Sequence, residues 1–406
     1  MISLRPFRAW RPVPDKAAFV GSRSYVTYTP EELAEKLRRD PYSFLHVIHP
    51  QENTDAGGSQ RESRYKLIRN AFRRFCEQGI MLRDERPSIY LYEQHAHGNV
   101  SRGLITGVSV MDYLKGTIKV HEQTLTVREQ LFTEYLHATG INAEPVLLAT
   151  PPGTDWPALL DPLRSGPPCY EFITNDGIQH RLWVSDDMDL RTTLQRKFAE
   201  IPSLYIADGH HRMASSARLA EEQCCTDVDP AAWCLAYIVP HDQLFIYNFD
   251  RVVSSLGQLT PAEFLEKLSA IGDLAPVRSA RSAPGIISIR TSAGWHSLKL
   301  PDLSKDAAPV ERLDAARLNS MILAPILGIT DLRSDRRISF VPGICGTVEL
   351  EKLVDDGSAA AAFHLHPVSF TEMRAVADTG GIMSPKSTYI EPKLRSGITV
   401  YSLEDV

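Results

Sequence analysis

The segment from Leu204 to Ser216 concentrates residue types that can bind and move phosphate: an acid, a glycine, two imidazoles and a guanidinium in succession. The apolar run before Asp208 predicts a buried strand, Gly209 permits close backbone approach, and a helix is expected to begin near Arg212. The unpaired N–H groups at a helix N-terminus attract anions, and arginine binds phosphate oxygens in bidentate geometry. The segment therefore predicts a phosphate cradle built on a strand, a turn and a helix.

Three side chains of this turn have candidate chemical roles. Asp208 could hold a magnesium ion or accept a proton, while His210 and His211 could donate a hydrogen bond or transfer a proton. The structural alternative is that Asp208 only caps the helix and that both imidazoles pack beneath it. Placing so many polar groups in one turn is costly for structure alone, so the residues favour a function.

The stretch from Ile118 to Thr124 holds a second candidate, His121 next to Glu122. This pair offers a proton acceptor and a carboxylate within one turn of the chain. A zinc site of the HExxH type is not supported, because Leu125 stands where the second histidine would be. A polar, solvated approach to the following helix is the structural alternative, and the residues alone favour neither.

The chain from Met383 to Gly397 combines cations with hydroxyl groups and forms the third candidate. Its Lys-Ser-Thr sequence is similar to the end of a P-loop, but the GxxxxG spacing before the lysine is missing, so a Walker fold is rejected. What remains is a loop of anion ligands and hydroxyl donors, with a basic solvated tail as the alternative. The residues that we expect to contact phosphate here are Lys386, Ser387, Thr388, Lys393 and Arg395.

The composition of the 406-residue chain limits its class: 43% of the residues are hydrophobic, 23% are charged, and the formal net charge is −6. These values are typical of a soluble globular protein with more than one hydrophobic core, and they exclude collagen and coiled coils. The acidic balance argues against bulk nucleic-acid binding, which needs a net basic face. We expect a cytoplasmic protein, since neither the roughly 18 to 20 successive apolar residues of a membrane helix nor a secretory signal is found.

Periodicity and turn signals predict alternating helices and strands, and hence a mixed α/β (α+β) fold in several parts. Expected helices cover residues 29–39, 64–78 and 126–140; Thr126 and Glu129 would form a capping box in the third, and Gly140 would end it. Expected strands cover residues 44–50, 88–92, 104–110, 146–149, 204–207, 234–239, 285–290 and 338–341. Proline- and glycine-rich stretches divide the chain into residues 1–150, 151–280 and 281–406, three parts that would share one cleft.

Short segments along the chain resemble, in this order, those of the family catalogued as domain of unknown function 1015. They are residues 6–9, 44–50, 118–124, 207–212, 337–338, 386–388 and 391–393. The resemblance extends over essentially the full length, and the family name assigns no activity. Two departures stand out: the usual Pro-Tyr-Asp-Val is replaced around residues 24–27, and Gln51 follows Pro50 where an acid is more typical. Loss of these acids would alter substrate choice or weaken catalysis.

The turn from Asp208 to Arg212 is also similar to the phosphate-binding strand-turn-helix of the ParB-like and sulfiredoxin-like superfamily. Members of that superfamily bind nucleotides at this motif, and they include a kinase of free serine. The resemblance covers only the motif. It implies nucleotide phosphates at the turn and phosphoryl transfer to a small hydroxylated acceptor such as L-serine.

The leading hypothesis is a magnesium-dependent kinase of amino-acid metabolism that transfers phosphate from ATP or ADP to the hydroxyl of a free amino acid. Such a transfer needs charge neutralisation and positioning more than covalent chemistry, and the three clusters supply both. Gly209 and Arg212 would join the Lys-Ser-Thr loop in holding the phosphates, and Asp208 and Glu391 would hold the metal. The expected catalytic residues are Asp208, His210, His211, His121 and Glu122.

Two other functions stay open at this point. A metal-dependent phosphoester hydrolase could use the same imidazoles and carboxylates to activate water. A ParB-like module could bind or sense a nucleotide without turnover. In each case the expected partners are a nucleotide or a small metabolite, and neither a membrane nor a nucleic acid is expected.

Overall fold

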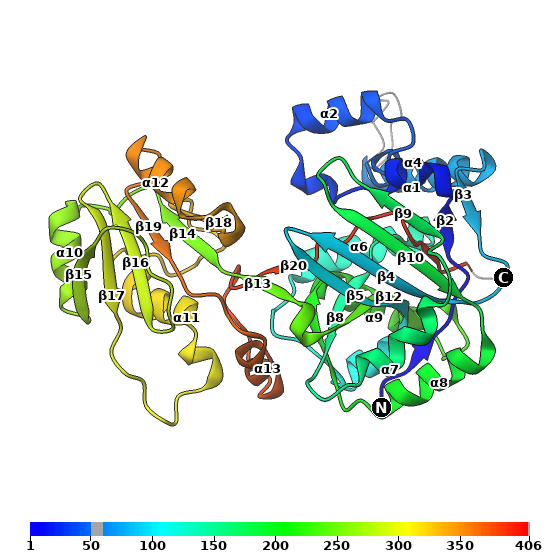
Figure 1. The fold of residues 1–406 in the computed structure, drawn as a ribbon. Helices are drawn as coiled ribbons and strands as arrows, with labels where there is room; N and C mark the ends of the chain where they lie inside the picture. The colour runs from blue at the N-terminus through cyan, green and yellow to red at the C-terminus, as the bar shows by residue number, and fades with distance from the viewer. Residues whose placement is uncertain (50–59, 405–406) are drawn as a thin grey trace. The chain divides into compact units, whose positions relative to one another are not determined.

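The structure is a computed structural model that describes residues 1–49 and 60–404. Contacts divide the chain into two compact units: unit 1 consists of Met1–Lys119, Thr124–Leu244 and Pro392–Val406, and unit 2 of Val120–Gln123 and Phe245–Glu391 (Figure 1). These bounds differ from the predicted parts 1–150, 151–280 and 281–406, because unit 1 is assembled from segments far apart in the sequence. The three-part division rests on proline and glycine clusters, which mark turns as well as domain boundaries.

Unit 1 is built on a mixed sheet with the strand order β6-β11-β8-β12-β5-β4-β10-β9, in which β1 also pairs with β5. Most neighbours are antiparallel, but β11 runs parallel to β6 and β12 runs parallel to β8. The strands are β1 (Leu4–Arg5), β4 (Ile89–Ala96), β5 (Asn99–Ser109), β6 (Ile118–Lys119), β8 (Val146–Thr150), β9 (Tyr170–Ile173), β10 (Gln179–Ser185), β11 (Leu204–Asp208) and β12 (Trp233–Pro240). Every residue of β12 is buried, as its unbroken apolar sequence requires of a strand covered on both faces.

Helices surround this sheet (Figure 1), and α6 packs against α9, which contacts β8 and β12. The helices of unit 1 are α1 (Ala17–Val20), α2 (Pro30–Arg39), α3 (Leu45–Ile48), α4 (Gln60–Glu77), α5 (Val110–Leu114), α6 (Thr126–Thr139), α7 (Trp156–Leu160), α8 (Met188–Ala199) and α9 (His210–Glu222). Two small ribbons complete the unit, β2 (Trp10–Pro12) with β3 (Met81–Arg83) and β7 (Ile141–Asn142) with β21 (Tyr401–Ser402). The last ribbon attaches the C-terminal segment to unit 1.

Unit 2 contains an antiparallel sheet with the order β15-β17-β16-β19-β14-β18 and a separate ribbon of β13 and β20. Its strands are β13 (Phe245–Tyr247), β14 (Phe249–Val253), β15 (Asp273–Val277), β16 (Ile286–Thr291), β17 (Gly294–Lys299), β18 (Ile338–Pro342), β19 (Ala361–His364) and β20 (Tyr389–Glu391). Its helices are α10 (Pro261–Ser269), α11 (Asp314–Leu318), α12 (Thr347–Asp355) and α13 (Phe370–Asp378). One apolar core joins the sheet to α10 and α11, and a second joins it to α12.

The predicted mixed α/β class is confirmed, and every predicted strand except the first corresponds to a strand of the structure. The helices expected at 29–39 and 64–78 are α2 and α4. The strand expected at 44–50 is wrong, since Leu45–Ile48 form the helix α3, and Pro50 lies outside the described residues. The apolar run is too short to distinguish the helical repeat of apolar residues from the strand repeat, and packing against α4 favours the helix.

The start of α6 also differs from its prediction. Leu125 occupies the N-cap position and makes no side-chain cap bond, while the hydroxyl of Thr124 bonds to Glu129. Thr126 is therefore the first residue of the helix and not its cap. The predicted end is confirmed: Gly140 adopts the left-handed conformation, with a φ of 68°.

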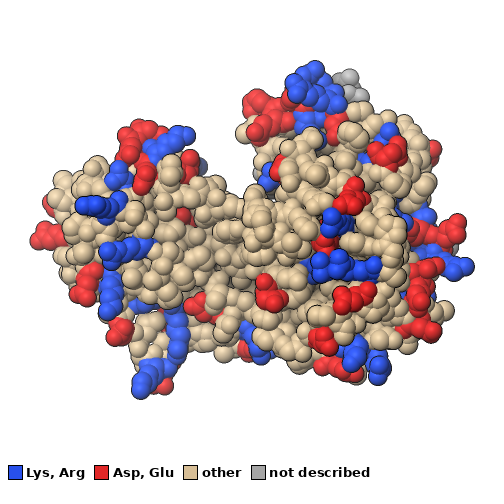
Figure 2. Space-filling model, in the orientation of Figure 1, with Lys and Arg blue, Asp and Glu red and all other residues tan. Residues whose placement is uncertain are grey.

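The surface agrees with the mixed charge of the sequence. Lys and Arg side chains lie intermixed with Asp and Glu on the face shown in Figure 2. No helix in the described part of the chain combines the length and the apolar character needed to cross a membrane.

Candidate functional site

The turn between β11 and α9 has the strand-turn-helix form that the sequence predicts. A register shift between Ile206 and Asp208 against β8 leaves one residue unpaired, and such a bulge re-aims the residue that follows. Gly209 then turns the chain with a φ of 95°, a left-handed value that a residue with a Cβ adopts only under strain. The helix begins at His210, so the first N–H groups of α9 lie next to Asp208 without partners inside the helix.

Asp208 is held between two cations from distant parts of the sequence. Its Oδ1 accepts a hydrogen bond from Nζ of Lys393 at 2.9 Å, and its Oδ2 pairs with Nη2 of Arg212 at 2.6 Å. Nη1 of Arg212 lies 2.5 Å from the carboxylate of Glu144. The alternative in which Asp208 caps the helix is not observed, because Gly209 occupies the N-cap position. Asp208 instead organises an ion-pair network at the helix N-terminus.

The electrostatics of this network keep Asp208 ionised. Burial alone would raise its pKa, but the charges of Lys393 and Arg212 lower the pKa to about 2. The network acts in the opposite sense on Arg212. Burial alone would lower the pKa of Arg212, but the carboxylates of Glu144 and Asp208 raise it. Asp208 is therefore a weak proton acceptor at neutral pH, and its main effect is to fix two cations in place.

The two histidines of the turn occupy different surroundings. His210 is only 4% exposed and lies close enough to Asp208 to contribute to the lowering of its pKa. Nε2 of His211 accepts a hydrogen bond from the backbone N–H of Leu125 at 3.1 Å, at the start of α6. This contact uses the Nε2 lone pair of His211 and ties α9 to α6.

Arg395 lies near Lys393 in the sequence but belongs to a different ion pair. Its Nη2 contacts Oδ2 of Asp176, in the turn between β9 and β10, at 2.5 Å. Burial alone would raise the pKa of Asp176, whereas hydrogen bonds from Thr174 and Arg395 lower it to about 2. The structure therefore assigns Lys393 to the Asp208 network and gives Arg395 a carboxylate of its own.

The other predicted site residues lie in unit 2. His121 is buried, its carbonyl accepts the N–H of Met383 at 2.8 Å, and Glu122 beside it is half-buried. In the Lys-Ser-Thr loop, Ser387 donates to the carbonyl of Ser384 at 2.7 Å. The remaining predicted residues of this unit are Lys386, which is exposed, Thr388, which is half-buried, and Glu391, which is buried in β20. Pro50 and Gln51 lie outside the described residues.

The Asp208 network does not have the donor set of a resident magnesium site. Both carboxylate oxygens of Asp208 already face cations. Glu391, the other predicted ligand, belongs to unit 2, and its role as a magnesium ligand stays a prediction. Within residues 1–49 and 60–404 there is no group of three or more His, Cys, Asp or Glu side chains arranged to hold a metal ion. A magnesium ion at this network would have to arrive with its ligand.

Sequence reasoning missed Glu144 and Asp176, the acids that hold Arg212 and Arg395. Neither lies in a motif: Glu144, between β7 and β8, meets Arg212 of α9, and Asp176, between β9 and β10, meets Arg395 of the C-terminal segment, so each pair follows only from the fold. A surplus of cations in the two predicted clusters was the available signal that such acids must exist.

The chain matches the family described as "Protein of unknown function (DUF1015)" over residues 4–316. It belongs to this family. The DUF1015 match runs from β1 into α11, and it includes the turn from Asp208 to Arg212. A search of curated proteins found no match.

Several solved structures are similar to this chain at low identity. A free serine kinase in complex with AMP is 15% identical over 73% of this chain and 91% of that chain, with a TM-score of 0.38. SbnI with a C-terminal truncation, from Staphylococcus aureus, is 13% identical over 74% and 90%, with a TM-score of 0.41. A conserved hypothetical protein from Pyrococcus furiosus is 16% identical over 74% and 96%, with a TM-score of 0.38. These values describe a distant likeness.

Proposed function

We propose that this protein is a phosphotransferase that moves a phosphoryl group from ATP or ADP to the hydroxyl of a free amino acid such as L-serine. The observation that carries the proposal is the network in which Asp208 holds Lys393 and Arg212 beside the N-terminus of α9. Two fixed cations at the N-terminus of a helix form a receptor for phosphate oxygens. The ParB-like character of the turn is part of the same proposal.

The network would stabilise the charge that develops during transfer. Arg212 would add the charge of its guanidinium, for which a phosphate competes with Asp208 and Glu144, and Lys393 would add a point charge. Asp208 holds both side chains in place. The nucleotide is proposed to enter as its magnesium complex, so that the metal is part of the substrate. Such positioning supplies most of what phosphoryl transfer requires.

The proton of the acceptor hydroxyl needs a base as the new P–O bond forms and the bond to the leaving nucleotide breaks. We assign this role to His210, because Asp208 has too low a pKa and Nε2 of His211 already accepts the N–H of Leu125. The leaving nucleotide carries away the electron pair of the broken bond. His121 and Glu122 in unit 2 stay predicted catalytic residues.

The Lys-Ser-Thr loop and Arg395 stay predicted phosphate ligands. The ion pair of Arg395 with Asp176 makes its role indirect, since a phosphate would have to compete with that carboxylate. The amino-acid acceptor follows from the resemblance of the turn to a kinase of free serine. Its identity is the part of the proposal that needs a direct assay.

The experiment is a transfer assay on the full chain. Purified protein is incubated with magnesium, labelled ATP or ADP and a panel of hydroxylated amino acids and other metabolites, and labelled products are separated. The proposal predicts label on the hydroxyl of one acceptor. Release of inorganic phosphate alone would favour a hydrolase, nucleotide binding without turnover would favour a sensing module, and no nucleotide binding at all would overturn the site.

A matched pair of variants connects the activity to the network. Arg212→Met removes the fork that contacts Asp208, whereas Arg218→Met removes an exposed arginine of the same helix that pairs with Glu222. Transfer is expected to be lost in the first variant and retained in the second, and circular dichroism verifies that both fold. Equal rates in the two variants would remove Arg212 from the chemistry.

A further inference from the structure

A buried arginine in unit 2 has no acid within ion-pair distance among the described residues. Arg251, on β14, is fully buried. Its Nη1 donates to the carbonyl of Phe249 at 2.5 Å, whereas its Nε and Nη2 have no hydrogen-bond partner in the described part of the chain. A guanidinium does not lose its proton in proteins, and a buried charge without a counter-ion is strongly destabilising. Burial lowers the pKa of Arg251 to about 10, and the charge of Asp250 opposes this shift without a hydrogen bond to Nε or Nη2. The position therefore favours an anion at these two nitrogens.

The two unpaired nitrogens of Arg251 define the shape of that anion. In a planar guanidinium, Nε–H and one N–H of Nη2 lie along the same edge and point in parallel directions. This edge binds two oxygens of one carboxylate or phosphate at once. The third nitrogen, Nη1, is engaged by Phe249 and holds the plane of the group. The buried Nε and Nη2 edge of Arg251 thus has the geometry of a bidentate oxyanion receptor.

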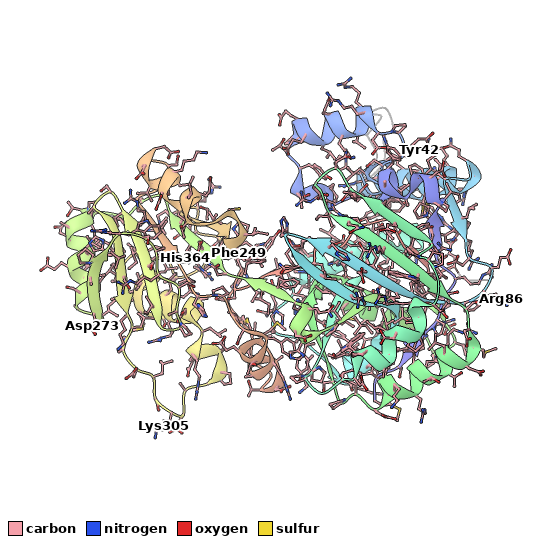
Figure 3. The ribbon with its side chains drawn as sticks, viewed as in Figure 1. Tyr42, Arg86, Phe249, Asp273, Lys305 and His364 are labelled. Carbon is pink, nitrogen blue, oxygen red and sulfur yellow. The ribbon has the colours of Figure 1, made fainter. Side chains whose placement is uncertain are left out.

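The surroundings of Arg251 offer it no carboxylate at hydrogen-bond distance within the described residues. Its guanidinium carbon lies 5.6 Å from the ring centroid of Phe340, and Phe363 is its register neighbour on β19. The adjacent Asp250 points to the opposite face of the strand, because successive side chains alternate. There its Oδ1 lies 3.0 Å from Nδ1 of His364, a residue labelled with Phe249 in Figure 3. Asp250 therefore acts on Arg251 through its charge alone and leaves Nε and Nη2 without a hydrogen bond.

A second cation lies on the same face of β14. Nζ of Lys386 lies 5.2 Å from the ring centroid of Phe249, and Phe249 and Arg251 are two residues apart on one strand, so their side chains share a face. Lys386 has a φ of 57°, a conformation that a non-glycine residue adopts at a cost. Neither Lys386 nor Arg251 forms an ion pair with an acid in the described part of the chain. Two cations without an acid favour a dianion over a single carboxylate.

We propose that the Nε and Nη2 edge of Arg251, together with Lys386, binds the phosphoryl group of a small ligand within unit 2. The inference does not rest on the proposed kinase activity, since the network of Asp208 belongs to unit 1. The proposal gives the Lys-Ser-Thr loop a phosphate-binding role that depends on Arg251, a residue of β14 outside every predicted motif.

Inorganic phosphate is the probe for the test, with acetate as the monoanion arm and sodium chloride added to equal ionic strength. Phosphate is expected to bind the wild-type chain in calorimetry and to raise its melting temperature, because a ligand that binds only the folded state stabilises it. Acetate is expected to have a weaker effect. A stronger response to acetate than to phosphate would contradict the phosphoryl assignment.

Variants locate the binding. Arg251→Lys keeps the charge but removes the fork, and it is expected to weaken phosphate binding by about 10- to 100-fold, the value of a hydrogen bond to a charged group. Lys386→Met changes an exposed residue, so it remains informative if Arg251→Lys does not fold, and it is expected to weaken binding as well. Arg374→Met, on α13 and paired with Asp378, is the control that leaves binding unchanged.

Two results would overturn the proposal. One is the absence of phosphate binding by the wild-type chain. The other is phosphate affinity that is equal in Lys386→Met, Arg251→Lys and the Arg374→Met control. Loss of kinase activity with phosphate binding intact would bear only on the proposed function, so the two ideas can fail separately.

Discussion

Asp208 owes its properties to the two side chains that it holds. A carboxylate with a cation on each oxygen is a poor base, and its two ion pairs hold Lys393 and Arg212 at the start of α9. Asp208→Asn would leave two cations without their shared acid. We expect this variant to fold and to lose most of its phosphotransfer, and a rate equal to wild type in the transfer assay would show that Asp208 takes no part in it.

The lowered pKa of Asp208 also predicts a pH dependence of stability. The folded-state pKa is about 2, below the ordinary value of 3.8, so the unfolded chain binds more protons in acid. The contribution of Asp208 to the free energy of unfolding is therefore complete above the ordinary pKa and is lost as the pH falls through the folded value. Its side chain is 37% exposed, so solvent screening reduces the effect.

This pH prediction is checked by denaturant unfolding of wild type and Asp208→Asn across the acid range. The difference between the two chains is expected to shrink as the pH falls toward 2. A difference that stays constant, or that grows in acid, would mean that the carboxylate of Asp208 is not stabilised by Lys393 and Arg212.

At the scale of elements, the turn depends on Gly209 in a left-handed conformation. Gly209→Ala would introduce strain of about 1–2 kcal/mol, and its Cβ would also meet Nε of Arg212 at 2.8 Å. Gly153 has nearly the same φ, 96° against 95°, and a Cβ added there would meet no described atom within 4 Å. Gly153→Ala is therefore a control for strain alone.

The two glycine variants are compared by denaturant unfolding and by nucleotide calorimetry. Both are expected to lose stability, Gly209→Ala more than Gly153→Ala because it also displaces Arg212, and only Gly209→Ala should lose nucleotide affinity. Equal nucleotide affinities in the two variants would show that nucleotide binding does not depend on the position of Arg212.

Elements whose pattern is locally decisive could be predicted from the sequence. The apolar run of β12 and the Gly140 terminus of α6 needed no tertiary information. The segment from Phe44 to Ile48 could not be assigned, because four or five apolar residues fit a strand and a helix equally. The Asp208 turn was predictable as a motif, but its partners Glu144 and Lys393 come from other elements and follow only from the fold.

At the scale of the whole molecule, the net charge of −6 contrasts with the cations gathered at single sites. A small phosphate ligand needs only local cations, whereas duplex DNA needs a continuous basic face. We expect no measurable binding of labelled duplex DNA in fluorescence anisotropy at physiological salt. Tight DNA binding with a steep salt dependence would contradict the inference that the acidic net charge excludes nucleic-acid partners.

The division of the chain into two units could not be predicted from the spacing of the candidate site residues. The Lys-Ser-Thr loop and Lys393 are close in the sequence, yet unit 2 ends at Glu391 and Lys393 belongs to unit 1. Spacing along the chain suggested one loop of anion ligands, whereas Lys393 contacts Asp208, Arg395 contacts Asp176 and Lys386 lies over the ring of Phe249.

The central claim is that the turn between β11 and α9 binds nucleotide phosphates through Arg212. The most direct measurement is calorimetric titration of magnesium–ATP and magnesium–ADP into wild type, Arg212→Met and Arg218→Met. The account predicts binding by wild type and by Arg218→Met, and affinity lower by about 10- to 100-fold in Arg212→Met. Equal affinity in all three proteins, or no binding by wild type, would contradict it.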